Sequence, residues 1–97
     1  MEPKTAAGPD SRRQLLFTEH FLEDLRFWVR SDARVAERLL KLVDLVARDP
    51  FQGRGKPEPL KRLEKTWSRR LTEEHRLTYR VTDEYVEYLQ ARFHYEK

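Results

Sequence analysis

The spacing of the apolar residues changes midway along this chain, and that change limits the fold more than any other feature of the sequence. Between residues 19 and 48, apolar side chains recur every three or four positions, which is typical of helices with one buried face. Pro50 ends the second helical segment, because proline disfavours a helical residue before it. Between residues 67 and 93, apolar and polar residues alternate, which indicates strands buried on one side. The expected helix stripes are Phe21, Leu22, Leu25, Trp28 and Val29, then Val35, Leu39, Leu42, Val43 and Val46.

The order of these segments predicts an α+β fold. A short strand over 12–17 precedes the helices, and a loop rich in glycine and proline over 51–59 separates them from three later strands. We therefore expect a two-helix hairpin packed on a small, mainly antiparallel sheet. With 97 residues and no cysteine, the chain depends on a hydrophobic core of one domain, expected over 12–97. Residues 1–11 are expected to form a flexible leader.

The alternation also predicts how the strands pair. Apolar residues share one face of the sheet if Trp67 pairs with Tyr79 and Tyr79 pairs with Leu89. Leu77 then pairs with Ala91. The core face of the last strand would carry Leu89, Ala91 and Phe93. The opposite face would carry Ser68, Arg70, Arg76, Thr78, Arg80, Gln90, Arg92 and His94.

This second face places positive charges side by side. Arg76 is expected directly opposite Arg92 and diagonal to His94. Like charges opposite one another destabilise a sheet, so the arrangement suits an anionic ligand better than it suits stability. The alternative is a set of outward arginines on a solvated face.

Composition and motifs exclude several classes of function. The net charge of +3 is modest, but basic residues concentrate in 54–70, which suits a polyanion or an acidic protein partner. The three histidines lack metal-ligand spacing, and Gly53 to Lys56 lacks the spacing of a phosphate-binding loop. We expect no metal and no cofactor. The absence of a signal peptide or of an apolar run long enough to span a membrane predicts a cytoplasmic protein with no membrane partner.

Three of the remaining polar residues match the requirements of one reaction. Glu58 lies between two prolines that restrict its backbone, and Arg76 and His94 lie on the polar face. A carboxylate, a guanidinium and an imidazole can serve as base, charge stabiliser and acid in phosphodiester cleavage by an internal 2′-hydroxyl. RNA has that hydroxyl and DNA lacks it. Taken alone, Glu58 also fits an ordinary solvated loop carboxylate.

Three segments of the sequence, 51–60, 67–79 and 92–95, closely resemble the YoeB/Txe toxins of the RelE/ParE superfamily. The resemblance extends over residues 13–95 and includes the order of helices and strands. It implies the toxin half of a type II toxin–antitoxin pair. It also implies a ribosome-dependent endoribonuclease that cuts mRNA without metal and so inhibits translation.

The resemblance also implies roles for individual residues. Glu58 would be the general base, Arg76 the phosphate stabiliser and His94 the general acid. The expected substrate-binding residues are Lys61, Tyr95, Arg70 and Arg92. The expected contacts to ribosomal RNA are Arg54, Lys56, Lys65 and Arg69.

The implied partners are the ribosome, mRNA and an acidic antitoxin of the YefM/Axe kind, with a second copy of the chain as a further candidate. Two other functions stay open. One is a ParE-like toxin that inhibits DNA gyrase by protein contact, against which Glu58 and His94 argue. The other is a nucleic-acid-binding module without catalysis, although the helices lack the glycine-containing turn typical of a helix-turn-helix.

Overall fold

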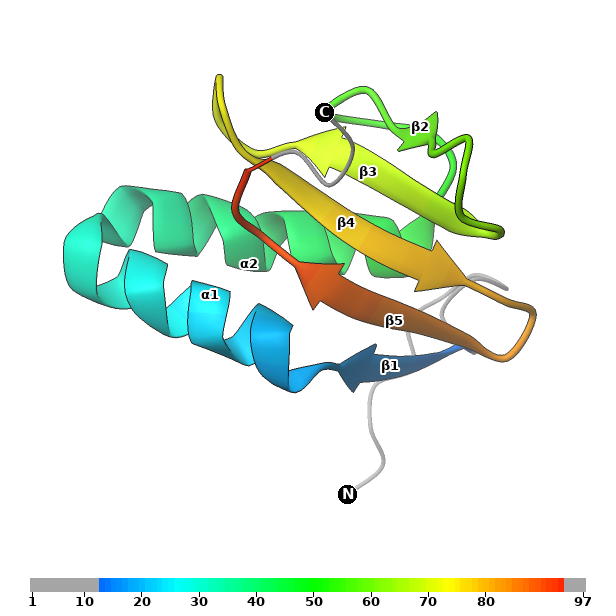
Figure 1. Cartoon of the computed structure of the whole chain (residues 1–97), viewed down its shortest axis with the longest axis horizontal. Coiled ribbons are helices and arrows are strands. Elements are labelled where there is room, and N and C mark those ends of the chain that lie inside the picture. Colours follow the sequence, from blue (N-terminus) through cyan, green and yellow to red (C-terminus); the bar gives the residue numbers. More distant parts are fainter. Residues whose placement is uncertain (1–12, 94–97) are drawn as a thin grey trace.

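Two helices pack on a five-stranded sheet in the computed structural model, which describes residues 13–93 (Figure 1). The elements are β1 (Gln14–Phe17), α1 (Glu19–Ser31), α2 (Ala33–Arg48), β2 (Glu58–Pro59), β3 (Thr66–Arg70), β4 (Arg76–Val81) and β5 (Tyr85–Gln90). The strand order is β1-β5-β4-β3-β2, with β1 parallel to β5 and the other neighbours antiparallel. The predicted fold class is therefore confirmed. The expected leader over 1–11 lies outside the described residues.

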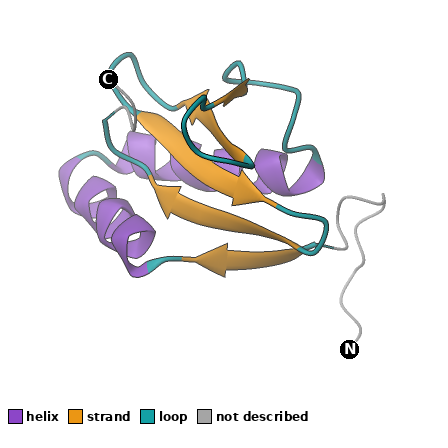
Figure 2. Ribbon diagram, turned by 45° about the vertical axis from the view of Figure 1, so that its right-hand side comes forward, coloured by secondary structure: helices purple, strands orange, loops and turns teal. Residues whose placement is uncertain are grey.

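The two helices form a hairpin on one face of the sheet (Figures 1 and 2). The Thr18 hydroxyl caps α1 by accepting a hydrogen bond from the Phe21 N–H, as Ser and Thr commonly do at this position. Asp32 ends α1 and also begins α2, where its carboxylate accepts from the Arg34 N–H. One residue thus serves both helix ends, which makes the connection short and the helices antiparallel. Within the described part of the chain, neither helix is long and apolar enough to cross a membrane.

The core lies between the helices and the sheet. Its buried apolar residues are Phe21, Trp28, Val35, Ala36, Leu39, Leu42, Val43, Val46, Leu71, Leu77, Tyr79, Val81, Val86, Tyr88 and Ala91. Two tyrosines cross this layer and donate to backbone carbonyls, Tyr79 to Pro50 at 2.7 Å and Tyr88 to Val43 at 2.7 Å. Burial raises the pKa of both phenols, so they stay neutral and act as donors. The predicted stripe of α2 is confirmed.

The predicted stripe of α1 is wrong at one residue. Val29 is 58% exposed, whereas Asp24, which is not part of the predicted stripe, is buried. The Asp24 carboxylate accepts a 2.8 Å hydrogen bond from the Ala91 N–H, just beyond the end of β5. A buried backbone donor needs a partner, and this need outweighs the helical periodicity.

The predicted register of β5 is only partly correct. Trp67 pairs with Tyr79 as expected, but Tyr79 pairs with Tyr88 instead of Leu89. The register shifts by one residue between Thr78 and Tyr79, which leaves Leu89 as the extra residue of a β-bulge. The shift reverses the alternation along β5, so that Val86 and Tyr88 are buried and Leu89 is only half-buried. Phe93, also expected in the core, is 55% exposed.

The loop over 51–59 also differs from its prediction, because its last two residues form the edge strand β2. Glu58 pairs with Ser68 and Pro59 with Trp67. A proline is tolerated there because an edge strand can leave one side unpaired. The pairing fixes Glu58 against the sheet.

Candidate active site

Arg76 is the first residue of β4, and its side chain is almost completely buried. Its Nε donates to the Ser68 hydroxyl at 2.8 Å, and its Nη2 lies within hydrogen-bond distance of the carbonyls of Ser68 and Lys56, at 3.2 and 3.3 Å. These contacts come from β3 and from the loop before β2. The guanidinium is therefore held in one orientation before any ligand arrives.

Glu58 faces this guanidinium from the edge strand β2. Its Oε1 lies 3.8 Å from the Arg76 Nη2, and its side chain is 64% exposed. Prolines on both sides restrict its backbone, and the pairing with Ser68 brings it beside Arg76. The site thus combines a fixed, buried cation with a carboxylate that solvent can reach.

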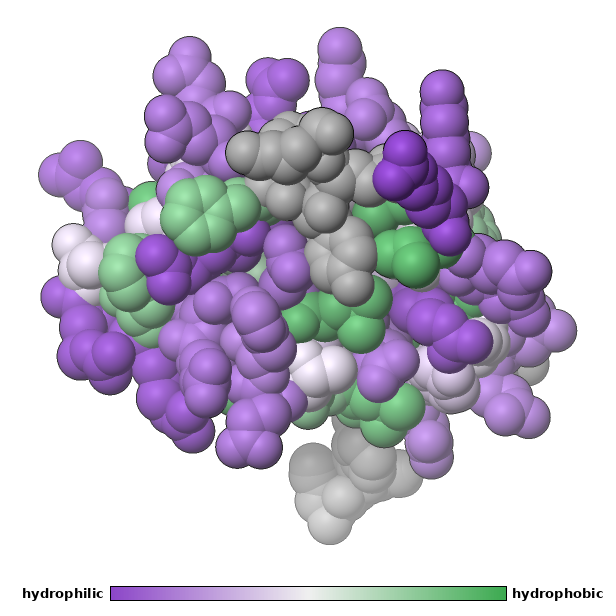
Figure 3. Space-filling model, in the orientation of Figure 1, coloured by the Kyte–Doolittle hydropathy of each residue, from purple (hydrophilic) through white to green (hydrophobic). Residues whose placement is uncertain are grey.

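A second arginine makes the site more positive. Arg70 lies directly opposite Arg76 in the register of β3 and β4, and it is exposed. Burial lowers the pKa of the Arg76 guanidinium, the Glu58 carboxylate raises it, and Arg70 lowers it again. Arginine stays protonated in proteins, so both cations persist at neutral pH. In the orientation of Figure 1, hydrophilic side chains cover most of the visible surface of the described residues (Figure 3).

The structure thus brings together three of the predicted site residues, namely Glu58, Arg70 and Arg76. Lys61 is exposed in the turn between β2 and β3. His94 and Tyr95 lie outside the described residues. The chain before them is nevertheless fixed beside the site, because the Phe93 carbonyl accepts a 3.2 Å hydrogen bond from the Arg76 N–H.

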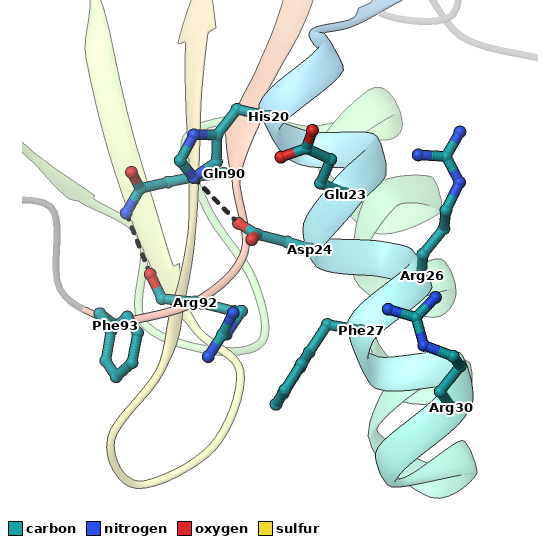
Figure 4. A pocket seen from close by; sticks show the side chains of 9 residues that line it. All are labelled: His20, Glu23, Asp24, Arg26, Phe27, Arg30, Gln90, Arg92 and Phe93. Carbon is teal, nitrogen blue, oxygen red and sulfur yellow. Dashed lines mark hydrogen bonds and ion pairs between the residues drawn. The ribbon is translucent and has the colours of Figure 1, made fainter.

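Arg92 does not lie opposite Arg76, and this part of the prediction is wrong. β5 ends at Gln90, so the alternation that placed Arg92 on the polar face no longer applies to it. Its guanidinium stacks on the Phe27 ring of α1, with Cζ 3.7 Å from the ring centroid. Both residues line an open groove of about 730 Å³ between α1 and the end of β5 (Figure 4).

The prediction that Arg69 contacts ribosomal RNA is also wrong. Its side chain is completely buried on the helix side of β3, so it has no surface to offer a phosphate. It donates to the Tyr79 hydroxyl and to backbone carbonyls of the preceding loop. The other three residues of that set, Arg54, Lys56 and Lys65, are exposed.

Two residues of the site were not assigned a role from the sequence. Ser68 holds the Arg76 guanidinium. The predicted register placed both residues on one face of the sheet and could have indicated this contact. His75 accepts a 2.8 Å hydrogen bond from the Phe93 N–H through Nδ1, and its ring packs edge-on against Trp28. No motif in the sequence marks His75, because its partner comes from the irregular segment after β5.

The chain matches the family model of the YoeB-like toxin of bacterial type II toxin–antitoxin systems over residues 17–95. It is 48% identical over 83 residues to Toxin YoeB of Streptomyces coelicolor, a match that covers 84% of this chain and 99% of the relative. A YoeB/ParE toxin structure from Agrobacterium tumefaciens superposes with a TM-score of 0.79 at 45% identity, covering 84% of this chain and 99% of that one.

Two Staphylococcus aureus structures share the fold as well. They are a YoeB dimer, with a TM-score of 0.78 at 31% identity, and a YoeB–YefM complex, with a TM-score of 0.74 at 30% identity. Each match covers 87% of this chain and 99% of the solved chain.

Proposed function

Because this chain belongs to the YoeB-like toxin family of bacterial type II toxin–antitoxin systems, we propose that it is a metal-independent endoribonuclease that cleaves mRNA on the ribosome. The observation that carries the proposal is the pairing of Glu58 with Arg76. A buried guanidinium held by Ser68 and an exposed carboxylate 3.8 Å away supply a charge stabiliser and a base at one point. The acid would come from His94.

The proposed reaction is a transesterification within the RNA strand. Glu58 accepts the proton of a ribose 2′-hydroxyl, and the resulting oxygen attacks the adjacent phosphorus. Arg76 donates to the phosphate oxygens as negative charge grows on the five-coordinate phosphorus. His94 protonates the 5′-oxygen as its bond to phosphorus breaks. The products are a 2′,3′-cyclic phosphate end and a 5′-hydroxyl end.

The neighbouring residues would hold the substrate. Arg70 lies opposite Arg76 and can take a second phosphate oxygen or the next phosphate along the strand. Lys61 is exposed in the turn after β2, and Tyr95 follows the proposed acid. We propose that Lys61 contacts the phosphate and that Tyr95 stacks beside the scissile nucleotide.

We propose that the ribosome positions the mRNA, because a chain of this size has little surface to grip and align a strand for in-line attack. The proposed contacts to ribosomal RNA are now the exposed residues Arg54, Lys56 and Lys65. Binding through phosphates releases counterions, so the affinity for ribosomes should fall steeply as salt rises. A salt-independent affinity would contradict this role.

We also propose an acidic antitoxin of the YefM kind as a partner, and a second copy of the chain as another, since relatives form both assemblies. Carboxylates of such an antitoxin can pair with Arg70 and Arg76 in the manner of a phosphate. The partner would then compete directly with RNA. Hydrogen exchange on the complex tests this: protection confined to residues 19–48, with 58–61 unchanged, would mean that the antitoxin grips the helices instead.

The deciding experiment uses purified toxin that has been stripped of metal by EDTA and then freed of the chelator. The toxin is added to ribosomes programmed with a defined mRNA, in the magnesium that ribosomes need to stay assembled. We expect a single cut with a cyclic phosphate on the upstream fragment, and no cut when the scissile nucleotide carries a 2′-deoxyribose. Glu58→Gln should block cleavage. Cleavage of the deoxy substrate, or activity of the stripped toxin only after a transition metal is added back, would contradict the mechanism. Inhibition of gyrase supercoiling without RNA cleavage would favour the ParE-like alternative.

A further inference from the structure

Arg69 is a buried cation that is matched entirely by polar groups of the fold. Its Nε donates to the Tyr79 hydroxyl at 3.2 Å. Its two terminal nitrogens donate to the carbonyls of Asp49, Gln52 and Arg54. Within residues 13–93, no carboxylate forms an ion pair with it. The backbone of the loop after α2 therefore supplies the negative ends of dipoles that a buried charge requires.

The loop is shaped around this guanidinium by two glycines. Gly53 has φ of +121°, and a Cβ there would lie 3.2 Å from Nη1 of Arg69. Gly55 has φ of +89°, and a Cβ there would lie 3.0 Å from the Arg70 carbonyl oxygen and 3.2 Å from the Arg69 Cβ. Both backbone conformations disfavour any other residue. The loop can thus close over Arg69 only because these positions lack side chains.

The same loop continues directly into the site. The Gly55 carbonyl accepts a 2.8 Å hydrogen bond from the Arg70 N–H, and the next carbonyl, of Lys56, accepts from Arg76. Two residues later, Glu58 pairs with Ser68 and faces Arg76. The carbonyls that hold Arg69 and those that reach the site therefore belong to one short stretch of chain.

We propose that Arg69 is a positioning residue: by anchoring the 49–55 loop from the helix side of the sheet, it sets where Lys56 and Glu58 lie relative to Arg76. This inference rests on the cleavage reaction proposed above. A lysine keeps the charge but lacks the planar fork that reaches three carbonyls and a hydroxyl at once. Loss of the Arg69 guanidinium should therefore change the rate of the chemical step more than the affinity for the ribosome.

The test compares Arg69→Lys and Gly53→Ala with Arg38→Lys. Gly53→Ala disturbs the same contact from the loop side. Arg38→Lys alters a guanidinium–carbonyl bond from α2 to Leu71, which does not involve the 49–55 loop. For each variant, the single-turnover cleavage rate is measured at saturating ribosomes and compared with the ribosome dissociation constant. Amide exchange is followed at Arg70, bonded to Gly55, and at Val81, bonded to Lys65.

For Arg69→Lys we expect the cleavage rate to fall by about a hundredfold, as misplacement of a catalytic group by about 1 Å does elsewhere. The ribosome dissociation constant should change far less than the rate, because the long side chains of Arg54 and Lys56 can still reach a phosphate after a small shift of their backbone and Lys65 lies outside the loop. Exchange at the Arg70 amide should speed up by about tenfold, while the Val81 amide keeps its rate. Gly53→Ala should follow Arg69→Lys in direction, and Arg38→Lys should match the wild type in all three measurements.

Two results would overturn the proposal while the wild type still cleaves mRNA. One is a wild-type rate in Arg69→Lys despite faster exchange at Arg70. The other is a loss of rate matched by an equal loss of ribosome affinity, which would mean a role in binding. If Arg69→Lys does not fold, Gly53→Ala decides by the same criteria. A wild-type protein that cuts no mRNA overturns the proposed function itself, and the two failures are therefore distinct.

Discussion

Arg69 and Arg76 are both buried, but the two guanidinium groups are used differently on the two faces of the sheet. Arg69 points toward the helices, where its donors meet loop carbonyls and the Tyr79 hydroxyl. Arg76 points to the other face, where Ser68 and Lys56 hold it from within the protein and the exposed Glu58 faces it. One cation is matched completely by the fold, while the other, within residues 13–93, meets a counter-charge only at an exposed carboxylate.

This difference shows that burial alone does not separate a structural arginine from one suited to a ligand. What separates them is where the hydrogen-bond partners come from. Backbone carbonyls cannot leave Arg69, whereas the exposed Glu58 side chain can move away from Arg76 and admit an anion. The predictions below either break this contrast or sharpen it.

The largest effect is expected for Arg76→Lys. The lysine keeps a positive charge but loses the fixed fork, so the cleavage rate should fall by about 10²- to 10³-fold. The melting temperature should fall modestly, because the variant loses hydrogen bonds to Ser68 and Lys56 but no contact of the apolar core. Single-turnover cleavage and circular dichroism melts measure the two quantities. A variant that cleaves normally, or that fails only because it unfolds, would remove Arg76 from the proposed chemistry.

Glu58→Gln should lower the cleavage rate by about 10²-fold or more, since an amide cannot accept the 2′-hydroxyl proton. His94→Ala should have a similar effect by removing the proposed acid. Glu58→Gln should not shift the melting temperature appreciably, because Glu58 is exposed and adds no core contact. Growth inhibition after induction in the absence of antitoxin gives the same comparison in cells. Full toxicity in either variant would contradict its assigned role.

Leu77→Ala tests the helix side of the sheet, where Leu77 pairs with Arg69 and is completely buried. The cavity should lower the free energy of unfolding by about 2–5 kcal/mol. Leu39→Ala should do the same from α2. Urea unfolding measures the loss. The cleavage rate per folded molecule should stay near the wild-type value, and a rate that falls without any loss of stability would blur the contrast between the two faces.

Tyr79→Phe and Tyr88→Phe form a matched pair. Each removes one buried hydroxyl that donates to a carbonyl, and Tyr88→Phe should cost about 1 kcal/mol in the free energy of unfolding. Tyr79→Phe should cost more, because it also leaves the buried Arg69 Nε without its acceptor. Only Tyr79 also contacts Arg69, so only its loss should slow cleavage. Equal rates in the two variants would show that the Tyr79 contact does not contribute to positioning.

The two buried tyrosines should add a smaller effect, a loss of stability in alkaline solution. Burial raises the pKa of Tyr79 and Tyr88 in the folded state above the ordinary value of 10.0. Above about pH 10 the unfolded chain loses these protons while the folded chain keeps them, so stability falls as pH rises and is complete below that value. Urea unfolding followed from neutral to alkaline pH measures this decline. Tyr88→Phe should flatten this decline.

Regular patterns in the sequence predicted the regular parts of the fold. The α2 stripe and the pairing of Trp67 with Tyr79 follow directly from periodicity, and both are confirmed. The same alternation put Arg70 and Arg76 on one face. Glu58 was singled out by its flanking prolines, but its place beside Arg76 depends on β2, a strand too short for any periodicity to reveal.

The wrong predictions share a physical cause. Each concerns an irregular stretch of backbone, which the spacing of apolar residues cannot reveal. A single extra residue at Leu89 reversed the alternation in β5 and moved Tyr88 into the core. Arg92 left the polar face because the strand had already ended. Arg69 looked like one more surface cation, since only the three-dimensional path of the loop brings carbonyls to it. The places of Leu89, Arg92 and Arg69 are set by the folded backbone and not by any sequence period.

The parallel pairing of β1 with β5 fixes when the fold can close during synthesis. Thr18, at the end of β1, donates to Leu89, 71 residues later, and in residues 13–93 β1 has no strand neighbour other than β5. Contacts so distant in sequence form late, after the intervening chain has been made and the loop closed. The Phe93 contact to Arg76 is equally delayed. The ribosome that makes this protein must therefore synthesise the chain through Phe93 before the fold and its site can close.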